Sequence, residues 1–172
     1  MSDRWVQIRR LAAETRAAAR STTTDEGAAL AEAALKSRNL EVYPCQPSNL
    51  MLSGAKGVYT EYYVAYDRTF DRPRVAWILA HELGHAVLHG DQCQCDGQDL
   101  NEEPVTALLP YGAGAIDIYN PQQRRELEAN VFAASFLLPP EELRARFLSG
   151  ASFEDIAQQF GVSPTATLNA LA

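Results

Sequence analysis

The pattern of hydrophobic and polar positions changes its period near residue 40. Before that point, residues 3–20 are typical of one helix, and a second helix is predicted to begin after the polar break at 21–25 and to end near Arg38. After it, residues 40–68 contain short runs of β-branched and aromatic residues that glycines interrupt. We therefore expect two helices followed by a small, mostly antiparallel sheet.

A longer helix is predicted after this sheet. Asp71 is a suitable N-cap, Pro73 suits the first turn and Gly90 suits the end, so the helix should extend from about 72 to 89. Its hydrophobic positions recur on one face, which we expect to be buried: Val75, Ile78, Leu79, Leu83 and Val87.

The rest of the chain is predicted to contain one irregular segment and several helices. Residues 91–119 contain six acidic residues and no Lys or Arg. A helix should begin at Asn120–Pro121 and end at Pro139–Pro140, and a short helix should follow over 140–148. Residues 152–171 are predicted to form a helical hairpin, so the expected fold class is α+β.

Composition and charge argue against some classes of protein. The 172 residues are 47% hydrophobic and 22% charged, as in ordinary globular domains. The net charge of −7 argues against broad nucleic-acid affinity, and no apolar run reaches the roughly 18–20 residues that span a bilayer. The N-terminal residues do not resemble a signal peptide, and the three cysteines form no evident disulfide framework. We therefore expect a cytoplasmic protein that contacts neither a membrane nor nucleic acid directly.

The strongest chemical signal is His81-Glu-Leu-Gly-His85, an HExxH pattern within the predicted helix 72–89. Residues four apart on a helix point about 40° apart, so both imidazoles can bind one metal ion. Glu82 is rotated by about 100° from His81, which places it beside the ion as a general base for the attacking water. The alternatives are a chance occurrence and a pair of core histidines satisfied by hydrogen bonds. Two histidines and a glutamate would, however, be costly to bury without a partner.

A catalytic zinc site needs a third protein ligand. His89 lies four residues after His85, but a straight helix carries it about 12 Å along the axis from His81. We therefore interpret His89 as a neighbour of the site or a helix-end residue.

Glu126, on the next predicted helix, is the better candidate for the third ligand. It shares a face with Asn130, which could orient a ligand histidine, and with Ala129, whose small side chain allows a close approach. Glu128 points about 200° away from Glu126. The alternative is that both glutamates are solvated surface acids beside the arginines at 124–125.

Together these residues resemble the ImmA/IrrE metallopeptidase family. The similarity extends over roughly residues 25–170. It rests on His81-Glu-Leu-Gly-His85 with Leu88-His89, Glu126-x-x-Ala129-Asn130-x-Phe132-Ala133, Leu137-Leu138-Pro139, and the closing segment Ile156-Ala-Gln-Gln-Phe-Gly-Val-Ser163.

The resemblance implies a zincin-like fold, in which the HExxH helix packs on a small sheet and Glu126 completes a zinc site with His81 and His85. It implies a zinc-dependent endopeptidase whose catalytic residue is Glu82. Sites of this ligand set also accept manganese or iron. The implied partner is a protein substrate, a basic helix-turn-helix transcriptional repressor, cleaved in mobile-element or stress responses.

The chain is accordingly divided into an N-terminal helical extension (1–24), a metallopeptidase domain (25–139) and a C-terminal helical segment packed on it (140–172). The hairpin at 152–171 resembles a helix-turn-helix, but residues 147–172 contain no Lys or Arg. Because phosphate contacts supply most DNA affinity, we interpret this hairpin as structural or partner-docking.

Several assignments stay open. A donor for the developing oxyanion could come from Tyr66, Tyr111 or Tyr119, and Cys93-Gln-Cys95 could be plain thiols, a structural metal site or a redox sensor. An extended substrate could add to a sheet edge along 62–66. Two other functions are a metal-containing protein that sequesters a partner without cleaving it, and a metallohydrolase that acts on a small amide.

Overall fold

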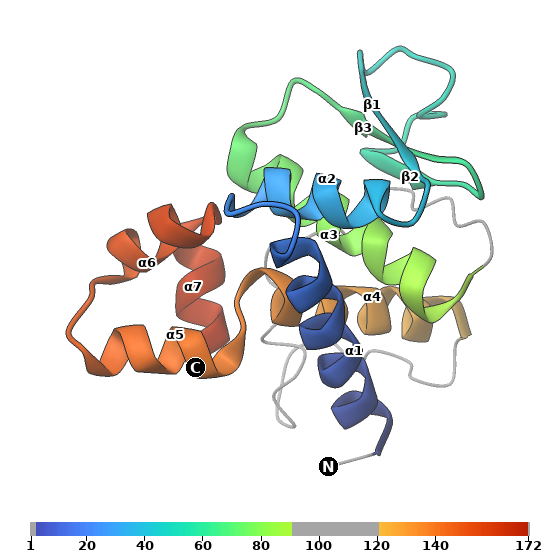
Figure 1. Cartoon of the computed structure of the whole chain (residues 1–172). Helices are drawn as coiled ribbons and strands as arrows, with labels where there is room; N and C mark the ends of the chain where they lie inside the picture. Colours follow the sequence, from blue (N-terminus) through green and yellow to red (C-terminus); the bar gives the residue numbers. More distant parts are fainter. Residues whose placement is uncertain (1–2, 91–120, 172) are drawn as a thin grey trace.

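Seven helices and three strands are present in the part of the chain that the computed structural model describes, residues 3–90 and 121–171 (Figure 1). The first elements are α1 (Asp3–Arg20), α2 (Ala28–Lys36), β1 (Glu41–Cys45), β2 (Gly57–Tyr59) and β3 (Tyr63–Asp67). The later helices are α3 (Arg72–Leu88), α4 (Pro121–Leu137), α5 (Pro140–Leu148), α6 (Phe153–Phe160) and α7 (Pro164–Leu171). The predicted α+β class is confirmed, while the predicted irregular segment 91–119 lies outside the described residues.

The sheet is mixed, with the strand order β1-β3-β2. β3 pairs parallel with β1, so that Val42 lies opposite Val64, and antiparallel with β2. The expectation of a mostly antiparallel sheet was therefore wrong for the β1 pairing. The short connection 60–62 forces β2 and β3 into an antiparallel hairpin, whereas the long segment 46–62 between β1 and β3 allows a parallel return.

The position of β3 also corrects the expected substrate edge. β3 is the central strand, and both of its backbone edges are already paired with neighbouring strands. An extended peptide therefore has no place to add along 62–66, and the outer strands of this sheet are β1 and β2.

α3 begins and ends close to the predicted residues. The Asp71 side chain accepts a hydrogen bond from the backbone N–H of Arg74 at 2.9 Å, and His89 is the C-cap before Gly90, whose φ is 69°. The predicted hydrophobic face is buried except for Val87, which is half-buried. α3 contacts β2 and β3 and also packs against α2 and α4. Because the helix is enclosed in this way, its polar side chains must find partners inside the protein.

α4 lies between α3 and α1, and Figure 1 shows α1 crossing it. The side chains of Phe132 and Phe136 on α4 are fully buried, as are those of Ile8 and Ala12 on α1. α1 and α3, which are far apart in the sequence, therefore pack against α4 from different sides.

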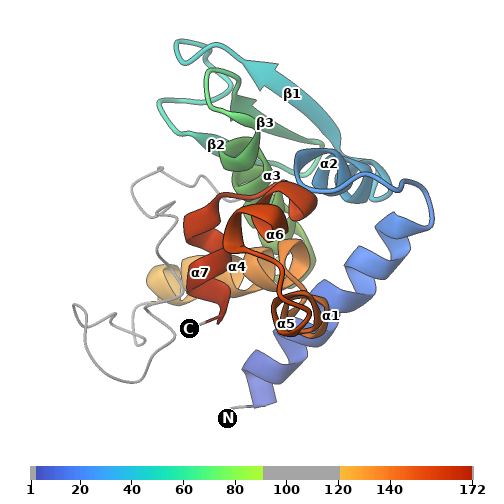
Figure 2. The same cartoon turned by 90° about the vertical axis from the view of Figure 1, so that its left-hand side faces the viewer.

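α5, α6 and α7 form a group at one side of the molecule, away from the sheet (Figures 1 and 2). A capping box begins α6, because Ser152 accepts from the backbone N–H of Asp155 at 3.1 Å and the Asp155 carboxylate accepts from the backbone N–H of Ser152. Gly161 ends α6 with a φ of 65° and lies against Gly27, since a Cβ added to Gly27 would come within 2.8 Å of the Gly161 carbonyl oxygen. The division of the chain at residues 24 and 139 stays a prediction.

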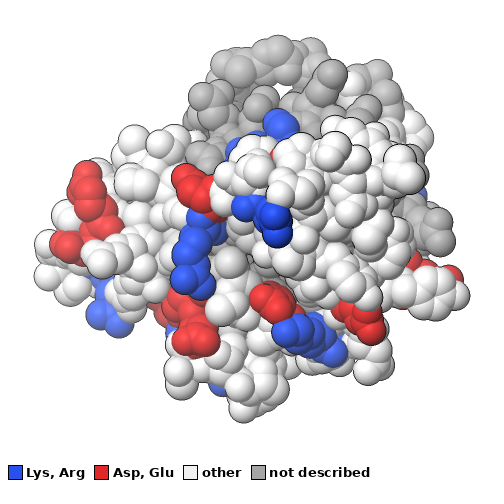
Figure 3. Space-filling view, turned by 90° about the horizontal axis from the view of Figure 1, so that it is seen from above, with Lys and Arg blue, Asp and Glu red and all other residues white. Residues whose placement is uncertain are grey.

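The surface gives two further observations. Among residues 3–90 and 121–171, no helix combines the length and the apolar character that crossing a membrane requires. The face shown in Figure 3 carries basic and acidic side chains next to one another, so neither sign of charge dominates it.

Candidate metal centre

Three side chains from α3 and α4 converge on one point inside the protein. Nε2 of His81 lies 3.0 Å from Nε2 of His85 and 3.2 Å from Oε2 of Glu126. Nε2 of His85 lies 3.5 Å from the same carboxylate oxygen. Both histidines are fully buried and Glu126 is 6% exposed. The structure therefore brings together the three residues predicted as metal ligands.

Asn130 and Gln122 orient this cluster from α4. Oδ1 of Asn130 lies 2.9 Å from Nδ1 of His81. An amide oxygen only accepts, so Nδ1 carries the proton and Nε2 presents a lone pair in the neutral ring. Nε2 of Gln122 donates to Oε1 of Glu126 at 3.0 Å, which leaves Oε2 directed at the two histidines. The contact between Asn130 and a histidine is the one that its position on the helix predicted.

Burial and mutual contacts set the charges in the cluster. Burial lowers the pKa of His81 and outweighs the hydrogen bond with Glu126, which raises it. Burial raises the pKa of Glu126, but hydrogen bonds and charges from His81 and His85 outweigh that effect and hold it well below its ordinary value. At neutral pH Glu126 is thus ionised, and a bound cation would replace the hydrogen bond at Nε2 of His81 by a bond to the lone pair of that nitrogen.

The donor set and its spacing fit a divalent transition-metal ion. Two imidazole nitrogens and one carboxylate oxygen are the protein ligands of a common class of catalytic zinc site. Ligands at zinc bond lengths of roughly 2.0–2.2 Å and tetrahedral angles lie about 3.3 Å from one another. The three distances here are 3.0, 3.2 and 3.5 Å. The residues therefore fit the predicted ion, and its identity as zinc stays a prediction.

Glu82 follows His81 on α3, is fully buried, and packs against β2. A Cβ added to Gly57 would come within 2.6 Å of both Oε1 of Glu82 and Cγ2 of Ile78. Glycine at this position therefore leaves room for the Glu82 carboxylate. In the sequence, Gly57 is only one of the glycines that interrupt the extended region, because nothing local to it indicates a contact with a residue on another element.

Gly84, inside the HExxH pattern, allows α3 and α4 to approach closely. A Cβ added there would come within 3.1 Å of the Cα and the carbonyl oxygen of Ala129 and within 3.3 Å of Cβ of Phe132. The close approach that the small side chain of Ala129 predicted is thus confirmed, and Gly84 contributes the other half of the contact. This approach allows a carboxylate on α4 to meet histidines on α3.

Replacing Gly84 by Ala should destabilise the protein. Overpacking of a tight contact costs about 1–3 kcal/mol, which over most of this range exceeds the roughly 1 kcal/mol that Ala gains over Gly in a helix. The nearest atoms belong to the Ala129 backbone, so no side-chain rotation relieves the contact. Urea unfolding of the metal-free protein measures the free-energy difference. A variant as stable as the unchanged chain would contradict this account of the packing.

His89 and Glu128 lie outside the cluster. Nε2 of His89 lies 3.3 Å from the backbone carbonyl oxygen of Arg125, so this histidine joins the end of α3 to α4, in keeping with the predicted helix-end position. Glu128 is only 4% exposed. The alternative in which Glu126 and Glu128 are both solvated surface acids is therefore wrong.

The sequence also left open the oxyanion donor and the role of Cys93 and Cys95. Tyr66 lines a pocket of about 260 Å³ together with residues of α2 and the first turns of α3, and none of the three cluster residues lines it. Tyr111 and Tyr119, the other candidate oxyanion donors, lie outside the described residues, as do Cys93 and Cys95.

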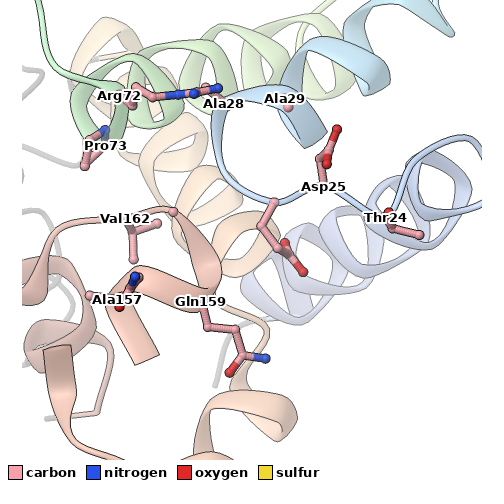
Figure 4. Close-up of a pocket in the computed structure, with 12 residues that line it drawn as sticks. Thr24, Asp25, Ala28, Ala29, Arg72, Pro73, Ala157, Gln159 and Val162 are labelled. Atoms are coloured by element: carbon pink, nitrogen blue, oxygen red, sulfur yellow. The ribbon is translucent and has the colours of Figure 1, made fainter. Parts of the chain in front are cut away.

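A larger pocket, of about 590 Å³, is separate from the cluster (Figure 4). It lies between the connection from α1 to α2, the start of α3 and the α6–α7 hairpin, with Asp25, Arg72 and Val162 among its lining residues. Neither the cluster residues nor Glu82 line this pocket. Among the described residues, the metal-ligand cluster at the junction of α3 and α4 is therefore separate from both pockets.

Comparison with known proteins gives a family match over the region of the chain that contains the cluster. A search of curated proteins found no match. The model of the Peptidase_M78 family, described as the IrrE N-terminal-like domain, matches residues 37–172. The match confirms the resemblance to the ImmA/IrrE family, and it leaves α1 and α2 outside the matched segment. Because that segment covers well over half of the chain and includes the whole His81–His85–Glu126 cluster, the chain belongs to the Peptidase_M78 family.

Proposed function

We propose that this protein is a zinc-dependent endopeptidase with Glu82 as its general base. The observation that carries the proposal is the convergence of Nε2 of His81, Nε2 of His85 and Oε2 of Glu126 within 3.5 Å of one another, one residue from a buried glutamate. Membership of a peptidase family supports the reaction class.

The residues around the site have separate tasks in this proposal. His81, His85 and Glu126 would hold the zinc ion, which when bound acts as a Lewis acid and makes an attacking water available at neutral pH. Glu82 takes the proton of that water and delivers it to the leaving amine. Asn130 keeps His81 in the tautomer whose Nε2 carries the lone pair. The chain thus supplies positioning and proton transfer from two helices that pack against each other.

We further propose that the substrate is a basic helix-turn-helix repressor, as the family resemblance suggests. The net charge of −7 supports a basic partner, because opposite charges favour encounter and disfavour wrong partners. Residues 147–172, which include α6 and α7, contain Glu154 and Asp155 but no Lys or Arg, so this part of the chain is acidic as well. A transcriptional role of the protein follows from this substrate.

The buried Glu82 favours hydrolysis over sequestration of a partner. A site that only binds has no use for a proton-transferring carboxylate beside its metal ligands, and burying such a group is costly. Hydrolysis of a small amide would use the same groups, so the choice of substrate separates it from peptide cleavage.

Metal removal tests the proposal. The purified protein is incubated with a library of peptides, and the products are identified by mass spectrometry before chelation, after chelation and after zinc is restored. We expect internal peptide bonds to be cleaved, cleavage to fall to background in the chelated sample, and zinc to recover it. Equal cleavage by a sample whose measured metal content is nil would refute the proposal. Binding of peptides without any product would support sequestration instead.

A further inference from the structure

Two arginines of α1 form hydrogen bonds with α4. Arg4 makes a bidentate contact with Glu128. Its Nη2 donates to Oε2 at 2.5 Å, and its Nε donates to Oε1 at 3.1 Å. Twelve residues later, Nη1 of Arg16 donates to the backbone carbonyl oxygen of Phe136 at 2.9 Å. The two contacts hold both halves of α4, and the first is two residues from Glu126.

Glu128 is a buried charge with a defined partner. It is 4% exposed and also accepts from Nε of Arg124 at 3.2 Å. An ionised carboxylate in such a place is stabilised by its arginines, and removing one of them is costly.

The two carboxylates of α4 face opposite sides of the helix. Positions 126 and 128 differ by about 200° around a helix axis. Accordingly, Glu126 meets the histidines of α3, and Glu128 meets Arg4 of α1. A rotation of α4 that brought Glu128 towards water would carry Oε2 of Glu126 away from His81 and His85. The contact of Glu126 with the histidines and that of Glu128 with Arg4 therefore both require one rotational position of α4 about its own axis.

We propose that Arg4 is a positioning residue for the metal centre, and that its contact with Glu128 fixes the rotation of α4 that brings Glu126 to the two histidines. The inference rests on the proposed metal-binding function. It gives α1, which lies outside the matched segment 37–172, a part in building the site.

The test measures zinc affinity, by competition with a chromophoric chelator, in the full chain and its variants at a temperature where all are folded. Arg4→Ala should weaken zinc binding by about 10- to 100-fold, the range for losing a partner that orients a ligand. Adding Glu128→Gln to Arg4→Ala should recover most of this loss, because the buried side chain that has lost its Arg4 partner then carries no charge. The visible absorption of the cobalt-substituted protein should change in Arg4→Ala and return towards its original form in the double variant.

Two controls separate positioning from general stability. Ile8→Ala removes a fully buried side chain from the same helix and should lower the unfolding temperature while leaving the zinc affinity of the folded protein unchanged. Arg10→Ala removes an arginine from an exposed pair with Glu14 and should change neither quantity.

The outcomes distinguish the two proposals. If the unchanged chain binds no zinc, the proposed function fails. If the unchanged chain binds zinc and Arg4→Ala binds it equally tightly with the same cobalt spectrum, only the positioning role of Arg4 fails. An equal loss of affinity in Ile8→Ala would also overturn that role.

Discussion

Replacing Glu82 by Gln should leave the metal ion bound and lower the rate of peptide hydrolysis by about 10²- to 10⁴-fold, the contribution typical of a general acid–base group. Gln has nearly the same shape as Glu, so it still fits beneath Gly57, where the carboxylate has no room to spare. The variant therefore removes proton transfer without disturbing the packing of α3 on β2. Initial rates of peptide cleavage and the zinc content of the purified protein measure the two quantities.

Glu14→Gln is a suitable control for this substitution. Glu14 is an exposed residue of α1 whose partner, Arg10, is also exposed. The same chemical change there should leave both rate and zinc content unaltered. A Glu82→Gln protein that binds zinc and cleaves peptides as fast as the unchanged chain would show that another group is the base.

Replacing Glu126 by Gln should abolish tight zinc binding and, with it, hydrolysis. The substitution removes the one carboxylate among the three ligands, and with it the anionic charge that attracts the ion. The loss of affinity should exceed the roughly 100-fold that removal of an orienting partner costs. Competition with a chromophoric chelator measures the affinity, and circular dichroism checks that the helices are retained.

Asn130→Ala provides the matched comparison on the same helix. Asn130 contacts Nδ1 of His81 but donates no atom to the ligand cluster. Its loss should therefore weaken zinc binding by about 10- to 100-fold, which is less than the loss in Glu126→Gln. If Glu126→Gln bound zinc as tightly as the unchanged chain, the third ligand would have to come from elsewhere.

The sequence by itself determined the local parts of the site. The four-residue spacing of His81 and His85 is a property of one helix, and so is the shared face of Glu126, Ala129 and Asn130. The caps at Asp71 and Ser152 are set by residues within one turn of the cap, and the structure shows both. Such features can be predicted because each depends on the geometry of a single helix.

The tertiary structure decided which distant residues meet. The parallel pairing of β1 with β3, the packing of Gly57 against Glu82 and the contact of Arg4 with Glu128 all join residues from different elements. No periodicity within one element specifies them, because they depend on how whole helices and strands dock. For this reason the ligands could be named from the sequence, whereas the contacts that hold them in place appeared only in the folded chain.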